Sequence, residues 1–163
     1  MGFTRAEQLH AVEWGGTRRD HRTETAQDLD ELLLGGSVGG TVHLAFDLPR
    51  GEISVAVLTI YPAPRAHVST PQTLRAFRTT AFGDAVSRAV PPRRIGRFGS
   101  SRHVAGRPNR PVRIDVTGLV RDEREGRVHL GLDAREREGL PWRIASPIAE
   151  NDALHPHLDV RVR

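Results

Sequence analysis

The chain contains no cysteine and no lysine, and only 5% of its residues are aromatic. Without cysteine it can form neither disulfides nor thiolate metal sites, and it has no thiol nucleophile. The 24 residues counted as Lys or Arg are therefore all arginines, a bias typical of a GC-rich genome. The net charge of +4 is too small to indicate nucleic acid as a partner.

Long apolar runs are also absent. Residues 1–16 carry Arg5, Glu7 and Glu13, and they lack the apolar stretch that a signal peptide needs. No stretch approaches the length of a membrane-spanning helix. We therefore expect no contact with a membrane, and a protein that is cytoplasmic or incorporated into an assembled particle.

Glycine and proline are abundant, with 16 and 11 of the 163 residues. These numbers suit a chain with many turns, and the length suits one domain with its own core. The clearest alternation of apolar and polar residues is Thr41–Asp47, where Val42, Leu44 and Phe46 share one face. We expect a hairpin between this strand and Leu29–Leu34, joined by the glycine-rich turn Gly35–Gly40.

Further alternating or apolar stretches predict strands at Ile53–Tyr61, Thr73–Thr79, Val112–Val116, Val128–Ala134, Trp142–Ala145 and Leu158–Val162. A short helical turn is predicted at Gly118–Asp122. The segment Arg93–Pro111 reads as a long loop that contains one short strand. The pattern is typical of an all-β fold, and we predict an antiparallel β-sandwich of jelly-roll type over residues 29–163.

Residues 1–28 are predicted to form a separate N-terminal arm that is partly helical. Thr4 and Glu7 have the spacing of a capping box, and Gly15 and Gly16 would end the helix. The apolar side chains of such an arm have little to pack on within their own segment, which favours a role in association.

Six segments carry a resemblance to a known family. They occur in the order Thr41–Pro49, Ala56–Tyr61, Ile114–Val120, Val128–Leu132, Ile144–Asn151 and Pro156–Val160. Their succession resembles the DNRLRE (disaggregatase-related) jelly-roll domains, and it is similar in outline to the propeptide fold of transforming-growth-factor-β precursors. The resemblance implies a non-catalytic domain of the kind found on secreted enzymes, surface proteins and virion proteins, some of which bind carbohydrate. It also implies that Asp115 and Thr117 cap the short helix.

Three motifs contain residues that can form catalytic or metal sites. Gly35–Gly39 matches the Gly-x-Ser-x-Gly pattern of serine hydrolases, but a strand rather than a helix is expected to follow it. His155 and His157 lack an assured third ligand. The oxygen-rich loop Glu150–Asp152 is interpreted as solvated, with a structural calcium ion as the alternative. We therefore predict no catalytic residue, no metal site, no cofactor and no enzymatic activity.

The most unusual feature is a set of arginines with no acid among them between Ala85 and Ile114. Guanidinium groups suit anionic partners. The predicted anion-binding residues are Arg88, Arg93, Arg94, Arg97, Arg102, Arg107, Arg110 and Arg113. The acids gather elsewhere, at Asp20–Glu31 and Asp122–Glu138, so the partner could be a second copy of the chain.

Two functional hypotheses follow. The first is a structural or assembly protein, a jelly-roll module that joins a larger particle such as a virion through its arm and its arginine-rich segment. The alternative is a carbohydrate-binding or adhesion module, with Trp14 and Trp142 as the candidate platform for a polysaccharide. Fold resemblance alone does not decide between them.

Overall fold

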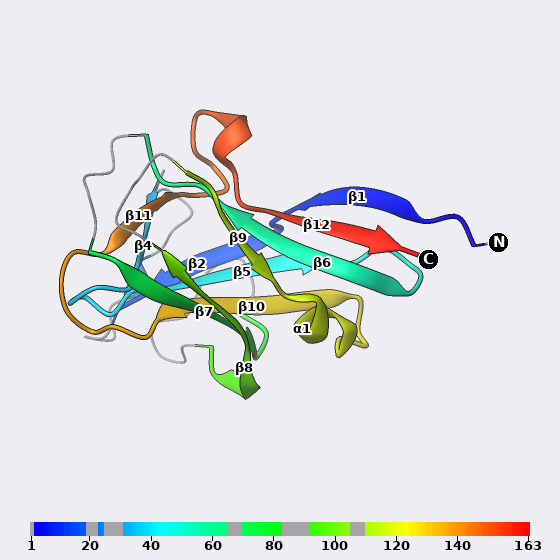
Figure 1. Cartoon of the computed structure of the whole chain (residues 1–163), viewed down its shortest axis with the longest axis horizontal. Helices are drawn as coiled ribbons and strands as arrows, with labels where there is room; N and C mark the ends of the chain where they lie inside the picture. Colours follow the sequence, from blue (N-terminus) through cyan, green and yellow to red (C-terminus); the bar gives the residue numbers. More distant parts are fainter. Residues whose placement is uncertain (1, 19–22, 25–30, 65–69, 83–91, 105–109) are drawn as a thin grey trace.

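The computed structural model describes residues 2–18, 23–24, 31–64, 70–82, 92–104 and 110–163. In this part of the chain the elements are β1 (Arg5–His10), β2 (Glu13–Thr17), β3 (Thr23–Glu24), β4 (Glu31–Leu34), β5 (Thr41–Asp47), β6 (Ile53–Ile60), β7 (Gln72–Thr79), β8 (Arg94–Val104), β9 (Val112–Asp115), α1 (Thr117–Arg121), β10 (Arg127–Ala134), β11 (Trp142–Ala145), the 3-10 helix η2 (Asp152–Leu154) and β12 (His157–Val162) (Figure 1).

The strands form two antiparallel sheets that pack against each other. One sheet has four strands in the order β1-β12-β6-β9, and the other has six in the order β3-β2-β5-β10-β7-β8. Along the chain, β5, β6 and β7 alternate between the sheets, and so do β8, β9, β10 and β12. This winding is that of a jelly roll. The predicted all-β sandwich is confirmed.

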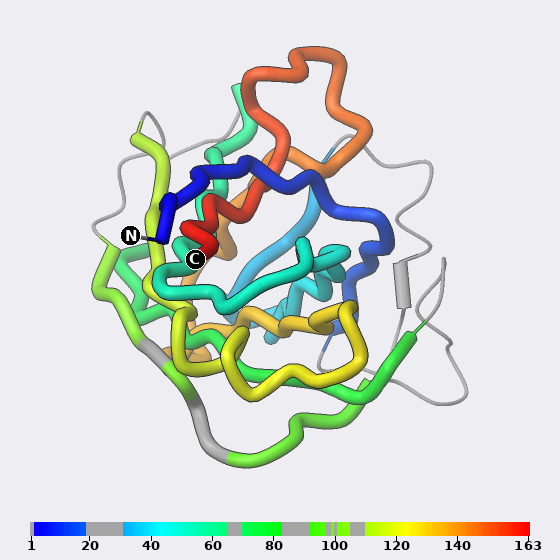
Figure 2. Tube along the Cα trace, turned by 90° about the vertical axis from the view of Figure 1, so that its right-hand side faces the viewer, coloured from blue at the N-terminus to red at the C-terminus, as the bar shows by residue number. Residues whose placement is uncertain are grey.

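In the described part of the chain, one hydrophobic core lies between the sheets. Figure 2 shows how the backbone winds around this interior. The alternation in β5 explains why: Val42, Leu44 and Phe46 are fully buried, whereas Thr41 and Asp47 are not. β10 supplies the matching row of Leu132, Leu130 and Val128 opposite these three residues. Each such side chain contributes about 1.5–3 kcal/mol to folding through burial.

The prediction of a partly helical N-terminal arm is wrong. Residues Arg5–His10 form β1 and pair with β12 along their whole length, and Glu13–Thr17 form β2 and pair with β5. Two neighbouring strands thus satisfy the backbone groups that a helix would have satisfied internally, and tertiary pairing overrides the local capping-box signal. Leu9 and Trp14 pack against the core, so the first strands belong to the fold.

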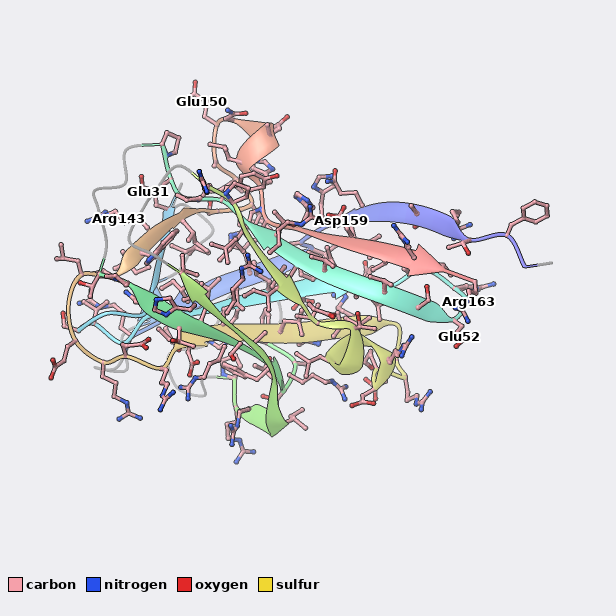
Figure 3. The ribbon with its side chains drawn as sticks, in the orientation of Figure 1. Glu31, Glu52, Arg143, Glu150, Asp159 and Arg163 are labelled. Carbon is pink, nitrogen blue, oxygen red and sulfur yellow. The ribbon has the colours of Figure 1, made fainter. Side chains whose placement is uncertain are left out.

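The predicted hairpin between the fourth and fifth strands is also wrong. β4 pairs with β11 in a separate two-stranded ribbon, and an ion pair of 3.4 Å between Glu31 and Arg143 joins the two strands (Figure 3). The expected glycine-rich turn between β4 and β5 does form, and it begins at Gly35. Its φ of +71° suits glycine, and a Cβ there would lie 1.8 Å from the side-chain oxygen of Gln72.

The short helix α1 is confirmed, but its cap differs from the expectation. Val116 is the N-cap residue, and its side chain makes no capping hydrogen bond. Asp115 instead accepts hydrogen bonds from the backbone N–H and the hydroxyl of Thr117, at 2.9 and 2.6 Å. These side-chain and backbone hydrogen bonds lower the pKa of Asp115. The Asp-Val-Thr step therefore fixes the turn between β9 and α1.

Candidate functional site

The arginine-rich segment forms an edge strand, where a loop with one short strand was predicted. β8 is 11 residues long and lies at the end of the six-stranded sheet, where β7 pairs with it on one side. The pairing register between β7 and β8 shifts at Phe77, because Ala76 pairs with Ser100 but Arg78 pairs with Ile95. Four residues of β8 therefore lie between these two pairs, where β7 has only one. β8 thus has two paired arms that flank an irregular stretch.

The glycines of that irregular stretch explain its path. Gly96 has a φ of +71°, which only glycine adopts without strain. A Cβ at Gly99 would lie 2.4 Å from Cγ of Leu119 in α1. The backbone of β8 therefore passes directly against α1, and the irregular stretch is held there by a close approach.

The arginines follow one side of the sandwich. β8 and β9 are the edge strands of the two sheets and contact each other. Five exposed arginines lie on these two strands or directly before them: Arg93, Arg94, Arg102, Arg110 and Arg113. We call these five residues the basic edge. The backbone of Arg97 lies on β8, whereas Arg88 and Arg107 lie outside the described residues.

These side chains do not share one face. Arg94 is opposite Thr79 and Arg102 is opposite Leu74, so the two arginines leave β8 on different sides of the sheet. Arg113 lies in the other sheet, 3.9 Å from Asp159. Arg93, Arg102 and Arg110 form no ion pair with any acidic side chain in the described part of the chain. The basic edge is therefore a set of exposed arginines along a seam between two sheets.

The acids of the second predicted cluster lie one or two strands away, and β7 already engages several of them. Arg75 forms two hydrogen bonds with Asp133, at 2.9 and 3.0 Å, and Arg78 binds Glu123 at 2.7 Å. These acids are not free to bind the basic edge of another copy. Most of the first cluster, Asp20–Glu31, lies outside the described residues.

A partly buried polar cluster, which the sequence patterns did not reveal, ties β2, β5 and β10 together on the outward face of the six-stranded sheet. Arg127 donates to Asp47 at 2.6 Å and also to Glu13, which is only 7% exposed. The second carboxylate oxygen of Glu13 lies 3.7 Å from Nε2 of His129. Glu13 and Arg127 are 114 residues apart in the sequence, so no spacing rule could pair them.

His43 completes this cluster, and its environment favours the neutral imidazole. Its side chain is 2% exposed, and Nε2 lies 3.1 Å from the hydroxyl of Thr17. Phe82 contacts the rings of both His43 and His129 edge-on, with centroids 5.6 and 5.0 Å apart. Burial lowers the pKa of His43 to about 4. Because His43 is neutral and Glu13 is already paired with Arg127, we interpret the cluster as a contact that holds β2, β5 and β10 together.

This burial gives a pH-dependent stability. His43 takes up a proton near pH 6.5 in the unfolded chain but near pH 4 in the folded one, so the unfolded state binds more protons between these values. The free energy of unfolding should therefore be constant above pH 6.5 and fall by about 3 kcal/mol as the pH drops to 4. Urea unfolding at several pH values should show a shallower slope for His43→Gln. The exposed His10→Gln should keep the wild-type slope, and parallel slopes for all three proteins would contradict the assignment.

The four-stranded sheet carries an open groove of about 590 Å³ on its outward face. Its lining includes Val55 and Val57 with the polar side chains of Gln8, Arg113, Asp159 and Arg161. Asp159, labelled on β12 in Figure 3, also lies 3.3 Å from Nε2 of His157. The groove shares Arg113 with the basic edge, and its lining residues include no aromatic side chain.

The two tryptophans of the predicted sugar platform differ in burial. Trp142 is 2% exposed and lies in β11 opposite Leu34, within the core. Trp14 lies opposite Leu44, is half-buried, and packs against the same core. A platform for stacking needs exposed aromatic faces. Burial on the core side of β11 therefore excludes Trp142 from such a platform, whereas the binding role of the partly exposed Trp14 stays a prediction.

The loop before β12 is organised by its own hydrogen bonds. Asn151 accepts from the backbone N–H of Ala153 and so caps η2, while Nε2 of His155 donates to the carbonyl of Ala149 at 2.6 Å. Glu150 points away from the body of the domain in Figure 3. Among the residues that the structure describes, no group of three acidic or histidine side chains is arranged to hold a metal ion.

No protein-family model and no curated protein matches the sequence. In the described ranges, no helix has the length and apolar character that crossing a membrane requires. The fold is defined by its strand order and its buried core. Its most unusual surface feature is the set of arginines along the edge strands β8 and β9.

Proposed function

We propose that this chain is a non-catalytic structural module that joins a larger assembly by binding an acidic, extended segment of a partner protein along β8. The observation that carries this proposal is the position of β8 at the edge of its sheet together with the arginines of the basic edge. The resemblance to DNRLRE jelly-roll domains implies a non-catalytic domain, which agrees with this proposal.

An edge strand offers backbone donors and acceptors on its open side, and an extended peptide can add to it as a further strand. Ile95 is 45% exposed on β8 and supplies an apolar contact beside the cations. A polypeptide uses the backbone edge and the arginines together, whereas a nucleic acid would use only the arginines. A protein partner therefore fits this surface best.

The charges on β8 also restrict the choice of partner. Cationic side chains on an edge strand discourage pairing with another copy of the same strand or with a neutral one. An acidic segment turns the same side chains into favourable contacts. Two neighbouring acids of this chain are already bound by Arg75 and Arg78, and we propose that the acidic segment comes from a different protein.

Substituting Arg93, Arg94 and Arg102 together by serine should weaken binding of a fluorescent oligoglutamate peptide about tenfold in 0.05 M salt. The estimate assumes that each exposed pair contributes up to about 1 kcal/mol. Fluorescence anisotropy measures the dissociation constant. Raising the salt to about 0.5 M should weaken wild-type binding by a similar factor, since the screening length falls to a few ångström.

The matched control replaces Arg50, Arg124 and Arg135 by serine. It makes the same change in net charge on exposed residues that lie outside β8 and β9. It should bind nearly as well as the wild type, and both variants should keep the wild-type melting temperature. Equal losses in the two triple variants would contradict a specific site and leave only a general attraction between charges.

A further inference from the structure

The edge strand β1, at the end of the four-stranded sheet opposite β9, has a different character from β8. β1 ends the four-stranded sheet and pairs with β12 through six consecutive residues without a bulge. Its charged side chains other than the histidine are Arg5 and Glu7, which form an ion pair on one face of the strand. Phe3, two residues before the strand, is 95% exposed. This edge lacks the excess of positive charge and the irregularity that protect β8 from self-pairing.

We propose that two copies of the chain pair through their β1 strands, antiparallel, about a two-fold axis that passes at Ala6. The two four-stranded sheets then continue into one sheet of eight strands. Such an interface is isologous, because each copy contributes the same patch. The proposal goes beyond the binding of an acidic partner at β8, and it depends on other residues.

Charge selects this register. With Ala6 opposite the partner's Ala6, Arg5 lies opposite the partner's Glu7, and this pairing occurs twice across the axis. Shifting the register by two residues either way places Glu7 opposite the partner's Glu7, or Arg5 opposite the partner's Arg5. Directly opposed like charges destabilise a strand pair, whereas opposite charges stabilise it.

Side-chain direction agrees with the same register. Arg5, Glu7 and Leu9 share one face of β1, while Ala6 and Gln8 share the other. After a shift by an odd number of residues, the face of β1 that carries Arg5 would align with the partner strand's face that carries Ala6. The two sheets could then not join with their core sides on the same side, so only even shifts keep the sheet continuous. In the proposed register Phe3 lies opposite the partner's Leu9, which packs against the core. The dimer therefore covers the most exposed aromatic side chain among the described residues.

A cysteine scan tests the axis directly, because the natural sequence has no cysteine. Opposed Cα atoms in an antiparallel pair lie about 4.5–5.5 Å apart, which a disulfide can span. Ala6→Cys should therefore give a covalent dimer under mild oxidation. In Gln8→Cys the two sulfur-bearing residues are four positions apart along the strands, roughly 13 Å, and the protein should stay uncrosslinked. Equal crosslinking of the two variants would overturn the register.

Charge reversal tests the contacts without a covalent bond. By analytical ultracentrifugation, Glu7→Arg should raise the dimer dissociation constant about tenfold, since two opposite-charge pairs become like-charge pairs. The double variant with Arg5→Glu and Glu7→Arg restores both pairs and should return to within about threefold of the wild type. A wild-type protein that stays monomeric at high concentration, or a double variant no better than the single one, would refute self-pairing. Oligoglutamate binding at β8 should be the same in all these variants, which separates the two proposals.

Discussion

Deletion of residues 1–17 is expected to abolish cooperative folding of the domain. The deletion removes β1 from one sheet and β2 from the other, and it takes Leu9 and Trp14 from the edge of the core. It also removes Glu13, one of the carboxylates that Arg127 binds, and exposes the edges of β12 and β5. The combined loss is comparable with the whole stability of a domain, about 5–15 kcal/mol.

Thermal unfolding followed by circular dichroism measures this effect, with deletion of residues 1–4 as the control. That shorter deletion ends before β1, so the melting temperature should stay within a few degrees of the full chain, about what a loss below 1 kcal/mol produces. A cooperative transition at an unchanged temperature after the longer deletion would show that the first two strands are a dispensable arm.

Trp142→Ala should lower the free energy of unfolding by about 3–5 kcal/mol, the usual range for removing a large aromatic side chain from a core. The side chain is 2% exposed and packs between the small ribbon and the main core. Its indole nitrogen is buried without a hydrogen-bond partner. Trp142→Phe keeps most of the ring and leaves no partner unsatisfied, so it should cost roughly half as much.

Urea unfolding of these two variants gives the numbers. Exposed Leu140→Ala, two residues earlier in the chain, is the control, and it should change the free energy of unfolding by less than about 0.5 kcal/mol. A Trp142→Ala protein with wild-type stability and a lost affinity for a glycan would instead restore the interpretation of this residue as a sugar platform.

The strands that the sequence predicts best are those with one apolar face. In β5 Val42, Leu44 and Phe46 share the face that meets the core, although two residues of the other face are buried as well, and the predicted bounds of β5 agree with the structure. β1 escaped detection because it is an edge strand on which Ala6, Gln8 and His10 are all exposed. Thr4, directly before β1, and Glu7 also have the spacing of a capping box. No local rule distinguishes this edge strand from the start of a helix.

The candidate sites show where sequence reasoning stops. The composition of the arginine-rich segment was visible in the sequence, but only the sheet order reveals that the segment is an edge strand. The pairing of β4 with β11 joins residues more than a hundred positions apart, and the contact of Glu13 with Arg127 does the same. Contacts of this range depend on how the jelly roll winds, which periodicity does not encode.

Hydrogen exchange along β8 tests the central claim most directly. With a saturating oligoglutamate peptide in about 0.05 M salt, the backbone amides of Arg94–Val104 that face the open edge should gain at least about tenfold protection, because strand addition gives them partners. The amides of β1 should not change. Protection should disappear in about 0.5 M salt, and a single-stranded oligonucleotide of equal charge should give none. Peptide binding without protection of β8, or stronger protection by the oligonucleotide, would contradict an acidic protein partner at this edge.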